Sequence, residues 1–486
     1  MEINNQTVFK NLIWRFAERV GAQGVSLVVS IVLARILAPD VYGTVALISV
    51  FQTILDVFVD SGLGNALIQK KNADDDDFTT VFCFNIIWCV ILYGLLYVGS
   101  PLAAGFYNDR SLVPLLRVAG ITVLISGVKN IQLAYVSRTM QFKKFFWATL
   151  GGTIFSGIVG ILLAYKGFGA WALVLQSVIN TAIDTCILWI SVKWRPTGRF
   201  RFDRLKRLFS YGWKLLVSAL LDKLYTNLRS LIIGKKYTTE DLAYYNKGNS
   251  WPELIVTNIN SSIDSVLLPT LSSEQDNRTR VKQMTRRAIS ISTYVMAPMM
   301  LGLFCVAPAL VSFLLTDKWL PIVPYMRIFC ITYLFYPIHT ANLNAIKAMG
   351  RSDLFLKLEI IKKIVGLAVL FSTMWFGPMI MAYSLLFVSL SSQIINTWPN
   401  KKLMDYSYLE QLKDIMPNIV MAVFMGVIVS IVSVFEFPSM VTLMIQVILG
   451  AVVYIGISFT SKNENFLYLW GIIKPIVFRL IKKKDI

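Results

Sequence analysis

The sequence contains very little of the chemistry that metal sites and nucleophilic catalysis usually need. Among its 486 residues it has one histidine, His339, and five cysteines, which lie in apolar runs without a Cys-x-x-Cys pair. A site with two histidine ligands is therefore excluded, and His339 alone is more typical of a packed or hydrogen-bonded residue than of a catalyst. The Gly-x-x-x-x-Gly-Lys loop that cradles nucleotide phosphates is also absent, which argues against ATP hydrolysis. We expect neither an enzyme nor a cofactor.

Long polar stretches are scarce as well. Hydrophobic residues make up 56% of the chain, and apolar runs recur with charged residues crowded into the short gaps between them. A helix needs roughly 20 apolar residues to cross a bilayer, so the pattern predicts an all-α integral membrane protein with about 14 transmembrane helices. Their expected limits are 11–37, 42–69, 77–106, 111–137, 144–166, 169–193, 208–234, 240–270, 284–315, 320–348, 353–376, 379–399, 412–435 and 438–460.

Acidic residues are few compared with basic ones. The chain has 47 Lys+Arg and 28 Asp+Glu, a formal net charge of +19. In a soluble protein this excess would suggest nucleic acid, but here the basic residues gather in alternate loops, above all 193–207 and 278–287, as the positive-inside rule requires of cytoplasmic loops. Both termini are therefore predicted to be cytoplasmic, and no nucleic-acid partner is expected. The first apolar run contains charged residues and no A-x-A site, so we expect no cleavable signal.

Three pairs of segments repeat at nearly the same offset. They are Asp40-Val-Tyr with Asp241-Leu-Ala-Tyr, Asp60-Ser-Gly-Leu with Asp264-Ser-Val-Leu, and Met140 to Phe168-Gly169 with Met349 to Phe376-Gly377. The constant offset favours duplication of a six-helix unit. We expect two pseudo-symmetric lobes, residues 1–193 and 208–400, joined by a basic cytoplasmic linker, 194–207, and followed by two further helices and a basic tail in 401–486. In such parallel repeats the substrate binds at the repeat interface.

Several of these segments resemble one known family. The segment Ala34 to Gly43, which reads Ala-Arg-Ile-Leu-Ala-Pro-Asp-Val-Tyr-Gly, together with Asp60 to Gly64 and Leu231 to Lys235, resembles the Wzx-type polysaccharide flippases of the multidrug/oligosaccharidyl-lipid/polysaccharide flippase superfamily. The resemblance implies a two-lobed carrier in the bacterial inner membrane. Such a carrier moves undecaprenyl-diphosphate-linked oligosaccharide, for O-antigen, capsule or exopolysaccharide, from the cytoplasmic to the periplasmic leaflet. It also implies Na⁺ or H⁺ coupling, contact with membrane lipids, and a polysaccharide polymerase and chain-length regulator as partners. One departure is Arg229, where we expect many relatives to carry an acidic residue.

Basic residues at membrane depth are the candidate contacts for the diphosphate. Charge inside a membrane usually faces a cavity or a partner. Asp222, Tyr225, Thr226 and Arg229 would share one face of the expected helix 208–234. Arg229 would then meet the diphosphate with Asp222 beside it, or the two would form an ion pair that locks helix packing.

The remaining candidate substrate contacts lie on four expected helices. Arg15 and Arg19 are one turn apart near the cytoplasmic end of the first helix, where they would reach an entering diphosphate or snorkel to lipid headgroups. Further buried cations would suit the same ligand. These are Lys129, Lys214, Lys223 and Arg327.

Carboxylates at membrane depth are the candidate sites for a coupling ion. Gln52, Asp56 and Asp60 fall on one face of the expected helix 42–69, and Asp264 is the repeat counterpart of Asp60. Buried carboxylates are the usual proton or sodium sites of secondary carriers, and Asp222 belongs to the same group. The alternative for Asp60 and Asp264 is that they cap or end helices. We therefore expect Asp56 to contribute most to coupling.

Three other interpretations make different demands on the polar residues. The run Asp74 to Asp77 could be a magnesium site for a nucleotide sugar, but its place just before an expected helix favours an N-terminal cap with solvated charge. A drug exporter of the same superfamily would need a mainly apolar cavity with one or two carboxylates. A membrane-embedded polysaccharide polymerase would need a large periplasmic loop or a catalytic histidine with partners. The charge inventory favours the flippase.

Overall fold

The described part of the chain is built of helices. The computed structural model describes residues 5–60 and 62–482, with side-chain surroundings for all of these except 5–13, 15–20, 211, 473 and 476–482. Within these ranges, nine helical segments are long and apolar enough to cross a membrane. The chain divides into two compact units, Met1–Ala243 (unit 1) and Tyr244–Ile486 (unit 2).

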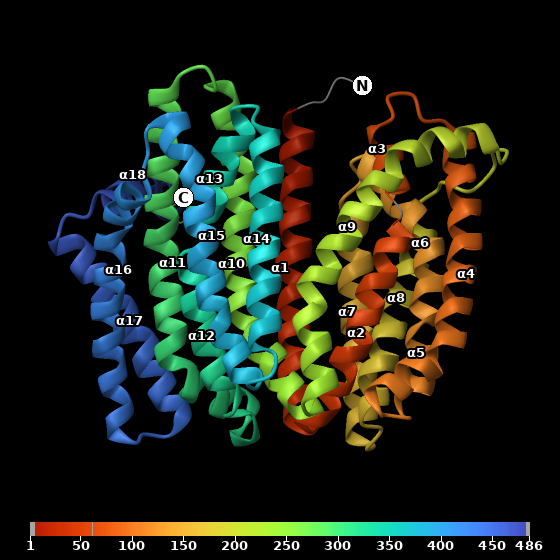
Figure 1. Ribbon diagram of the computed structural model, residues 1–486, viewed down its shortest axis with the longest axis horizontal. Coiled ribbons are helices and arrows are strands. Elements are labelled where there is room, and N and C mark those ends of the chain that lie inside the picture. Colours follow the sequence, from red (N-terminus) through yellow and green to blue (C-terminus); the bar gives the residue numbers. More distant parts are fainter. Residues whose placement is uncertain (1–4, 61, 483–486) are drawn as a thin grey trace. The chain divides into compact units, whose positions relative to one another are not determined.

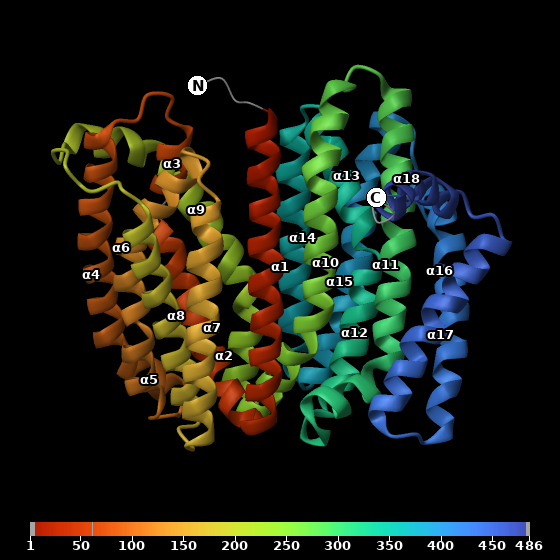
Figure 2. The same cartoon turned by 180° about the vertical axis from the view of Figure 1, so that it is seen from behind.

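Unit 1 contains the first nine helices and the start of the tenth (Figure 1). They are α1 (Asn5–Ile36), α2 (Pro39–Asp60), α3 (Leu63–Gln69), α4 (Asp75–Tyr107), α5 (Leu112–Ala119), α6 (Ile121–Arg138), α7 (Lys143–Tyr165), α8 (Ala170–Ser191) and α9 (Phe202–Lys236). Within this unit α7 packs against both α1 and α8 (Figure 2). Because α9 begins at Phe202, the expected linker 194–207 contains the first turns of that helix.

Unit 2 contains most of α10 and the remaining helices. They are α10 (Thr239–Ser273), α11 (Arg278–Leu315), η1 (Asp317–Trp319), α12 (Ile322–Leu334), α13 (Tyr336–Ala348), α14 (Ser352–Thr373), α15 (Pro378–Met404), α16 (Tyr408–Ile431), η2 (Val432–Phe435), α17 (Ser439–Thr460) and α18 (Glu464–Lys482). The last of these, α18, occupies part of the expected basic tail. Figure 1 shows α11, α16 and α17 side by side, as their contacts also indicate.

Each expected span overlaps one helix or two consecutive helices. Three spans are interrupted: 42–69 at Gly62, 111–137 at Gly120 and 320–348 at Phe335. The last two breaks fall in the fourth expected helix of each lobe. Left-handed glycines also precede α8 and α15, at Gly169 and Gly377, which the sequence repeat pairs. These matched breaks support duplication, while the count of fourteen crossings stays a prediction.

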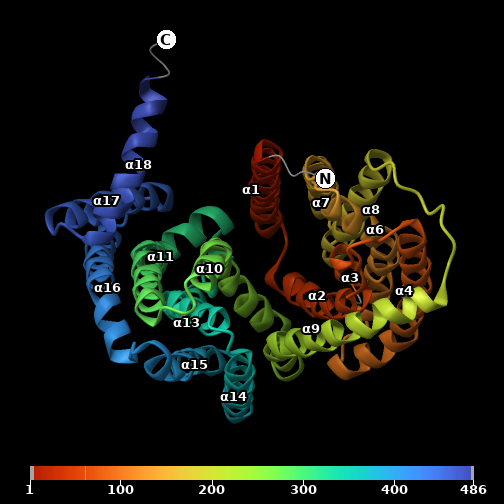
Figure 3. The ribbon, with the colours of Figure 1, turned by 90° about the horizontal axis from the view of Figure 1, so that it is seen from above.

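Two glycines of the quoted motifs are required by the backbone. A Cβ atom at Gly43 would lie 1.8 Å from the carbonyl oxygen of Thr239, so only glycine lets the start of α2 approach the start of α10. Gly62 has a φ of 69°, which favours glycine, and a Cβ there would lie 2.5 Å from the carbonyl oxygen of Gly212 on α9. These contacts let α9 pass close to α2, α3 and α4, as Figure 3 shows.

The substitution Gly43→Ala is expected to lower the midpoint temperature of unfolding by several degrees, because the added methyl group forces two backbones apart. Overpacking of this kind costs about 1–3 kcal/mol. Thermal unfolding of the purified protein in detergent measures the effect. Gly94→Ala on α4 is the matched control, since an added Cβ there meets nothing within 4 Å. Equal midpoints for the two variants would contradict the expectation.

The segment between α8 and α9 is bound to the acidic first turn of α4. The backbone N–H of Arg199 donates to Asp76 at 2.9 Å, and that of Arg201 donates to Thr80 at 3.0 Å. The indole N–H of Trp194 donates to Asp75 at 3.1 Å. The basic linker is therefore held along the start of α4 rather than being a free connection.

Arg204 completes this contact with the acidic turn. Its guanidinium binds Asp74 and lies 3.2 Å from Asp77, which is fully buried and also paired with Lys70 at 2.5 Å. The hydrogen bond from Arg204 holds the pKa of the Asp74 carboxyl below its usual range. Asp74 and Asp77 form a capping box at the N-terminus of α4, which confirms the expected cap. The expectation of solvated charge is wrong for Asp77, because the two cations enclose it.

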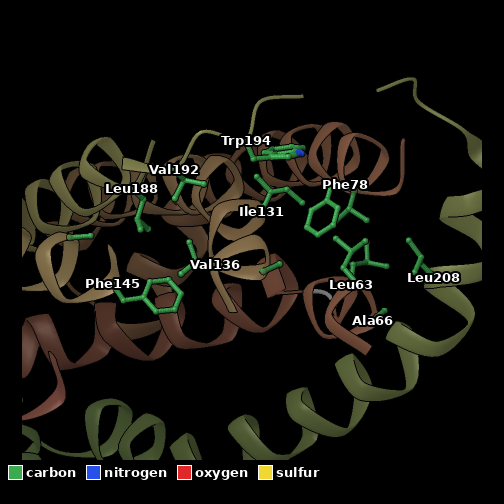
Figure 4. Close-up of a cluster of buried hydrophobic side chains, with 14 of the residues drawn as sticks. Leu63, Ala66, Phe78, Ile131, Val136, Phe145, Leu188, Val192, Trp194 and Leu208 are labelled. Atoms are coloured by element: carbon green, nitrogen blue, oxygen red, sulfur yellow. The ribbon is translucent and has the colours of Figure 1, made fainter. Parts of the chain in front are cut away.

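A large apolar cluster lies beside this contact. Figure 4 shows its members, which include Leu63 of α3, Phe78 of α4, Ile131 of α6, Leu188 of α8 and Trp194 of the linker. The Trp194 ring lies 5.8 Å from that of Phe78. With further members on α7 and α9, the cluster joins seven segments of unit 1. It so fixes α4, α6 and α8, the last two of which carry residues of the candidate site.

Candidate functional site

Polar side chains from three helices line a cavity of about 340 Å³ inside unit 1. The lining residues are Gln52, Asp56, Val59 and Asp60 of α2, Thr122, Ser126, Lys129 and Asn130 of α6, and Ser177 and Thr181 of α8. A second cavity of about 200 Å³ shares Asp60 and Asn130 with the first. Hydroxyl, amide and carboxylate groups therefore meet within one lobe.

The helical repeat explains why these groups converge. On each helix the polar residues recur at steps of about four and seven, which places them on one face. On α6 these residues are Thr122, Ser126 and Lys129, and on α8 they are Ser177 and Thr181. Because α2, α6 and α8 all contact one another, the three polar faces meet in the same space.

Charge in this region is mainly negative. Lys129 of α6 forms an ion pair with Asp184 of α8, which is largely buried. The amide of Asn130 donates to Asp60 at 3.1 Å and to the carbonyl oxygen of Val59 at 3.3 Å. With their ionised side chains, Asp56, Asp60 and Asp184 would outnumber the one lysine. The cavity is therefore suited to a small cation or a proton rather than to an anion.

Asp56 differs from Asp60 and Asp184 in the partners of its carboxylate. Its side chain is accessible from the cavity, and among the residues described no donor hydrogen-bonds its carboxylate. The carboxylate of Asp60 instead receives the Asn130 amide. No group of three or more histidine, cysteine or acidic side chains within the described ranges is arranged to hold a metal ion.

Unit 2 repeats the Asp60–Asn130 contact. The amide of Asn344 on α13 donates to Asp264 on α10 at 2.6 Å. Asp60 ends α2, whereas Asp264 lies well inside α10, so only Asp60 is a helix-terminal residue. The matching pair supports the repeat relation that the sequence predicted for these two aspartates.

The structure places the expected substrate contacts of α9 in different surroundings. Arg229 is 8% exposed and Tyr225 is half-buried. Lys214, Asp222 and Lys223 are exposed along the same helix. The polar face expected on this helix therefore has the buried Arg229 at one end and the exposed Asp222 at the other.

The other expected substrate contacts are not gathered at one place. Lys129 lies with the carboxylates of the polar cavity. Arg327 belongs to unit 2, where its Nε donates to the carbonyl oxygen of Phe304 at 3.2 Å and its guanidinium lies 5.1 Å from the centre of that ring. The side chains of Arg15 and Arg19 lie outside the described residues.

The sequence interpretation missed Asn130, Asp184 and the hydroxyl groups of α6 and α8. A usable signal was present, because Ser177, Thr181 and Asp184 share one helix face by their spacing, as Gln52, Asp56 and Asp60 do. Only the pairing of helices could show that these faces meet.

A family comparison identifies the chain. Residues 32–324 match the model of a family described as polysaccharide biosynthesis protein. The chain belongs to this family. Residues 32–324 include α2, α6 and α8, so all residues of the polar cavity lie in the matched segment.

Several curated proteins are similar to this member of the polysaccharide biosynthesis family over most of the chain. The teichuronic acid biosynthesis protein TuaB of Bacillus subtilis (strain 168) is 25% identical over 407 residues, 82% of this chain and 84% of that protein. The succinoglycan biosynthesis transport protein ExoT of Rhizobium meliloti (strain 1021) is 24% identical over 65% of this chain and 64% of its own length. The lipopolysaccharide biosynthesis protein WzxC of Escherichia coli (strain K12) is 21% identical over 72% of this chain and 71% of its own length.

Solved structures show the fold of this family member. The lipid II flippase MurJ in an inward closed conformation matches with a TM-score of 0.74 at 14% identity, over 93% of this chain and 99% of that chain. An inward-facing MATE family multidrug resistance transporter of the MOP superfamily matches with a TM-score of 0.61 at 13% identity, over 79% of this chain and 94% of that chain. The protein is thus an all-α, multi-pass membrane protein with the fold of these transporters.

Proposed function

We propose that the protein is a flippase that moves undecaprenyl-diphosphate-linked oligosaccharide from the cytoplasmic to the periplasmic leaflet of the bacterial inner membrane, with both termini cytoplasmic. The observation that carries the proposal is the fold, which follows that of a lipid II flippase along 93% of the chain. The names of the three relatives point the same way, because all of them concern polysaccharide biosynthesis and one describes a transport protein. The proposed activity is transport by alternating access, not catalysis.

The polar cavity of unit 1 is the proposed place for the coupling ion. A carrier driven by an ion gradient needs a group whose charge changes when the ion binds. Asp56 opens into the cavity with Asp60 and the hydroxyl groups of Thr122, Ser126, Ser177 and Thr181 around it. We propose that Na⁺ or H⁺ binds here and that its binding drives the transport cycle.

Arginine is the proposed contact for the diphosphate. A guanidinium donates two parallel hydrogen bonds to phosphate oxygens, which lysine cannot do. Arg229 is buried on α9, where loss of water strengthens such a contact. Arg19 of α1 is the proposed second contact.

A polysaccharide polymerase and a chain-length regulator are the proposed protein partners.

Leaflet-resolved transport in proteoliposomes tests the function. The purified protein is reconstituted with fluorescent undecaprenyl-diphosphate oligosaccharide, and the fraction reaching the outer leaflet is measured with and without Na⁺ and H⁺ gradients. We expect gradient-dependent transfer, and none in liposomes without protein. Transport of a lipophilic drug cation without transfer of the lipid-linked sugar would support a drug exporter and overturn the proposal.

A further inference from the structure

A second polar cleft lies in unit 2. It has a volume of about 1010 Å³ and is formed by residues 283–291 of α11 and 413–421 of α16, with the turn between α17 and α18 and the start of α18. The residues that matter for its chemistry are Arg286, Arg287, Lys413, Asp414, Lys462 and Glu464. The loop charges of the sequence place this end of the protein in the cytoplasm. None of these residues was singled out as a site by the sequence.

Hydrogen bonds between three segments give this cleft a fixed floor. The amide of Asn463 donates to the Asn418 side chain of α16 at 3.2 Å, and the amide of Asn418 donates to the carbonyl oxygen of Ser290 on α11 at 3.0 Å. Asn465 donates to the hydroxyl of Ser290 at 2.9 Å. Asn463 also accepts the backbone N–H of Asn465, at 2.9 Å, and thereby caps α18. The start of α18 is thus attached to the two long helices.

The charge around this floor is positive. Four cations, Arg286, Arg287, Lys413 and Lys462, line the cleft together with two carboxylates. Arg286 is paired with Asp414 at 2.5 Å. The guanidinium of Arg287 lies over the ring of Tyr468 at 3.7 Å, which leaves its N–H edge available to an anion. An excess of cations next to neutral amides and hydroxyls suits a single phosphodiester.

The helix that borders the cleft has the character of a membrane-surface helix. In Figure 3 α11 and α14 of unit 2 are seen nearly end-on, whereas α18 is seen along its length, so it lies across their direction. Phe466 and Leu469 pack inward on the apolar core of unit 2. Leu467, Trp470 and Ile472 are about half exposed. An amphipathic helix with exposed tryptophan and aliphatic side chains rests at the headgroup level of a bilayer.

We propose that this cleft binds the headgroup of an anionic phospholipid of the cytoplasmic leaflet, with Arg287, Lys413 and Lys462 around the phosphodiester. Basic pockets between transmembrane helices on the cytoplasmic side are known to take such headgroups. The exposed apolar side chains of α18 favour a lipid over a soluble phosphate, since they place hydrocarbon beside the positive charge. Lipid bound here would hold α18 against α11 and α16.

Native mass spectrometry of the full-length protein in neutral detergent tests the proposal. Phosphatidylglycerol and phosphatidylcholine with the same acyl chains are added in turn, and bound lipid is counted. The wild type is expected to retain one phosphatidylglycerol in preference to phosphatidylcholine. The double variant Arg287→Gln/Lys413→Gln should bind it about 10- to 30-fold more weakly, as expected when two surface cations are lost.

Two further double variants serve as controls for this test. Arg278→Gln/Lys401→Gln removes the same charge from exposed positions outside the cleft and should bind like the wild type. Arg287→Lys/Lys413→Arg keeps the charge and should keep the preference for phosphatidylglycerol. A loss of preference in the control, or an unchanged preference in the Gln double variant, would overturn the proposal. Equal competition by inorganic phosphate, or stronger binding of undecaprenyl phosphate, would do so as well.

Discussion

Arg229→Ala is expected to abolish transfer of the lipid-linked oligosaccharide while the protein still folds and inserts. Two hydrogen bonds between a buried guanidinium and phosphate would be lost, which corresponds to a decrease of about 100-fold or more in transport rate. Arg229→Lys keeps the positive charge but loses the paired donors, so we expect intermediate transport. The measurement is initial transfer rate in proteoliposomes, at matched protein density.

The controls must distinguish loss of a phosphate contact from loss of a structural contact, because Arg229 is 8% exposed and lies in a packed part of α9. Thermal unfolding of each variant shows whether the fold is kept. Asp222→Ala alone and with Arg229→Ala tests the ion-pair alternative, in which the double variant would recover transport. Such recovery would defeat the phosphate-contact interpretation, and so would wild-type transport by Arg229→Ala.

Most of the fold could be predicted because length and apolarity alone specify a membrane helix. The breaks could not be predicted in the same way. The span 42–69 is predominantly apolar on both sides of Gly62, and its division there follows from a left-handed backbone next to Gly212, a contact between distant segments. Helix α18 was missed for a related reason. It is too charged for a spanning helix, and its attachment depends on side chains of α11 and α16.

The candidate site was predicted in part. The polar face of α2 was correctly identified, since one helix is enough to define it. Lys129 was grouped with the phosphate contacts because sequence shows its charge but not its partner, Asp184, which lies on another helix. The basic linker was also interpreted only in part. Its basic residues were taken as a sign of a cytoplasmic loop, whereas Arg204 also binds the acidic first turn of α4.

The environment of the single histidine was predicted from the sequence. His339 was expected to be packed or hydrogen-bonded, and its Nδ1 lies 2.9 Å from the amide nitrogen of Asn396 in a buried setting. This confirms the expectation. The surrounding amides could not be predicted to meet, although Asn342 of α13 contacts both Asn400 of α15 and Gln411 of α16. Such a network fixes neighbouring helices because buried amides need partners.

Asp56→Asn is expected to abolish dependence of transport on the ion gradient, whereas Asp60→Asn and Asp264→Asn should each reduce it only a few-fold. Asparagine keeps the oxygen that accepts the Asn130 or Asn344 amide, so the contacts of Asp60 and Asp264 survive. Asp56 has no such contact among the described residues, and its side chain lines the cavity. Removing that charge removes the group that would bind Na⁺ or a proton.

The measurement compares transfer of the lipid-linked oligosaccharide with and without Na⁺ and H⁺ gradients for the three variants. Transfer by Asp56→Asn should fall to the level seen without a gradient, while energy-independent exchange between leaflets continues. Asp109→Asn, in the exposed loop after α4, is the matched control and should behave as the wild type. If Asp56→Asn keeps full gradient dependence while Asp60→Asn or Asp264→Asn loses it, the coupling group is not Asp56. A shared loss in all three variants would instead mean that the two Asp–Asn pairs take part in coupling as closely as Asp56 does.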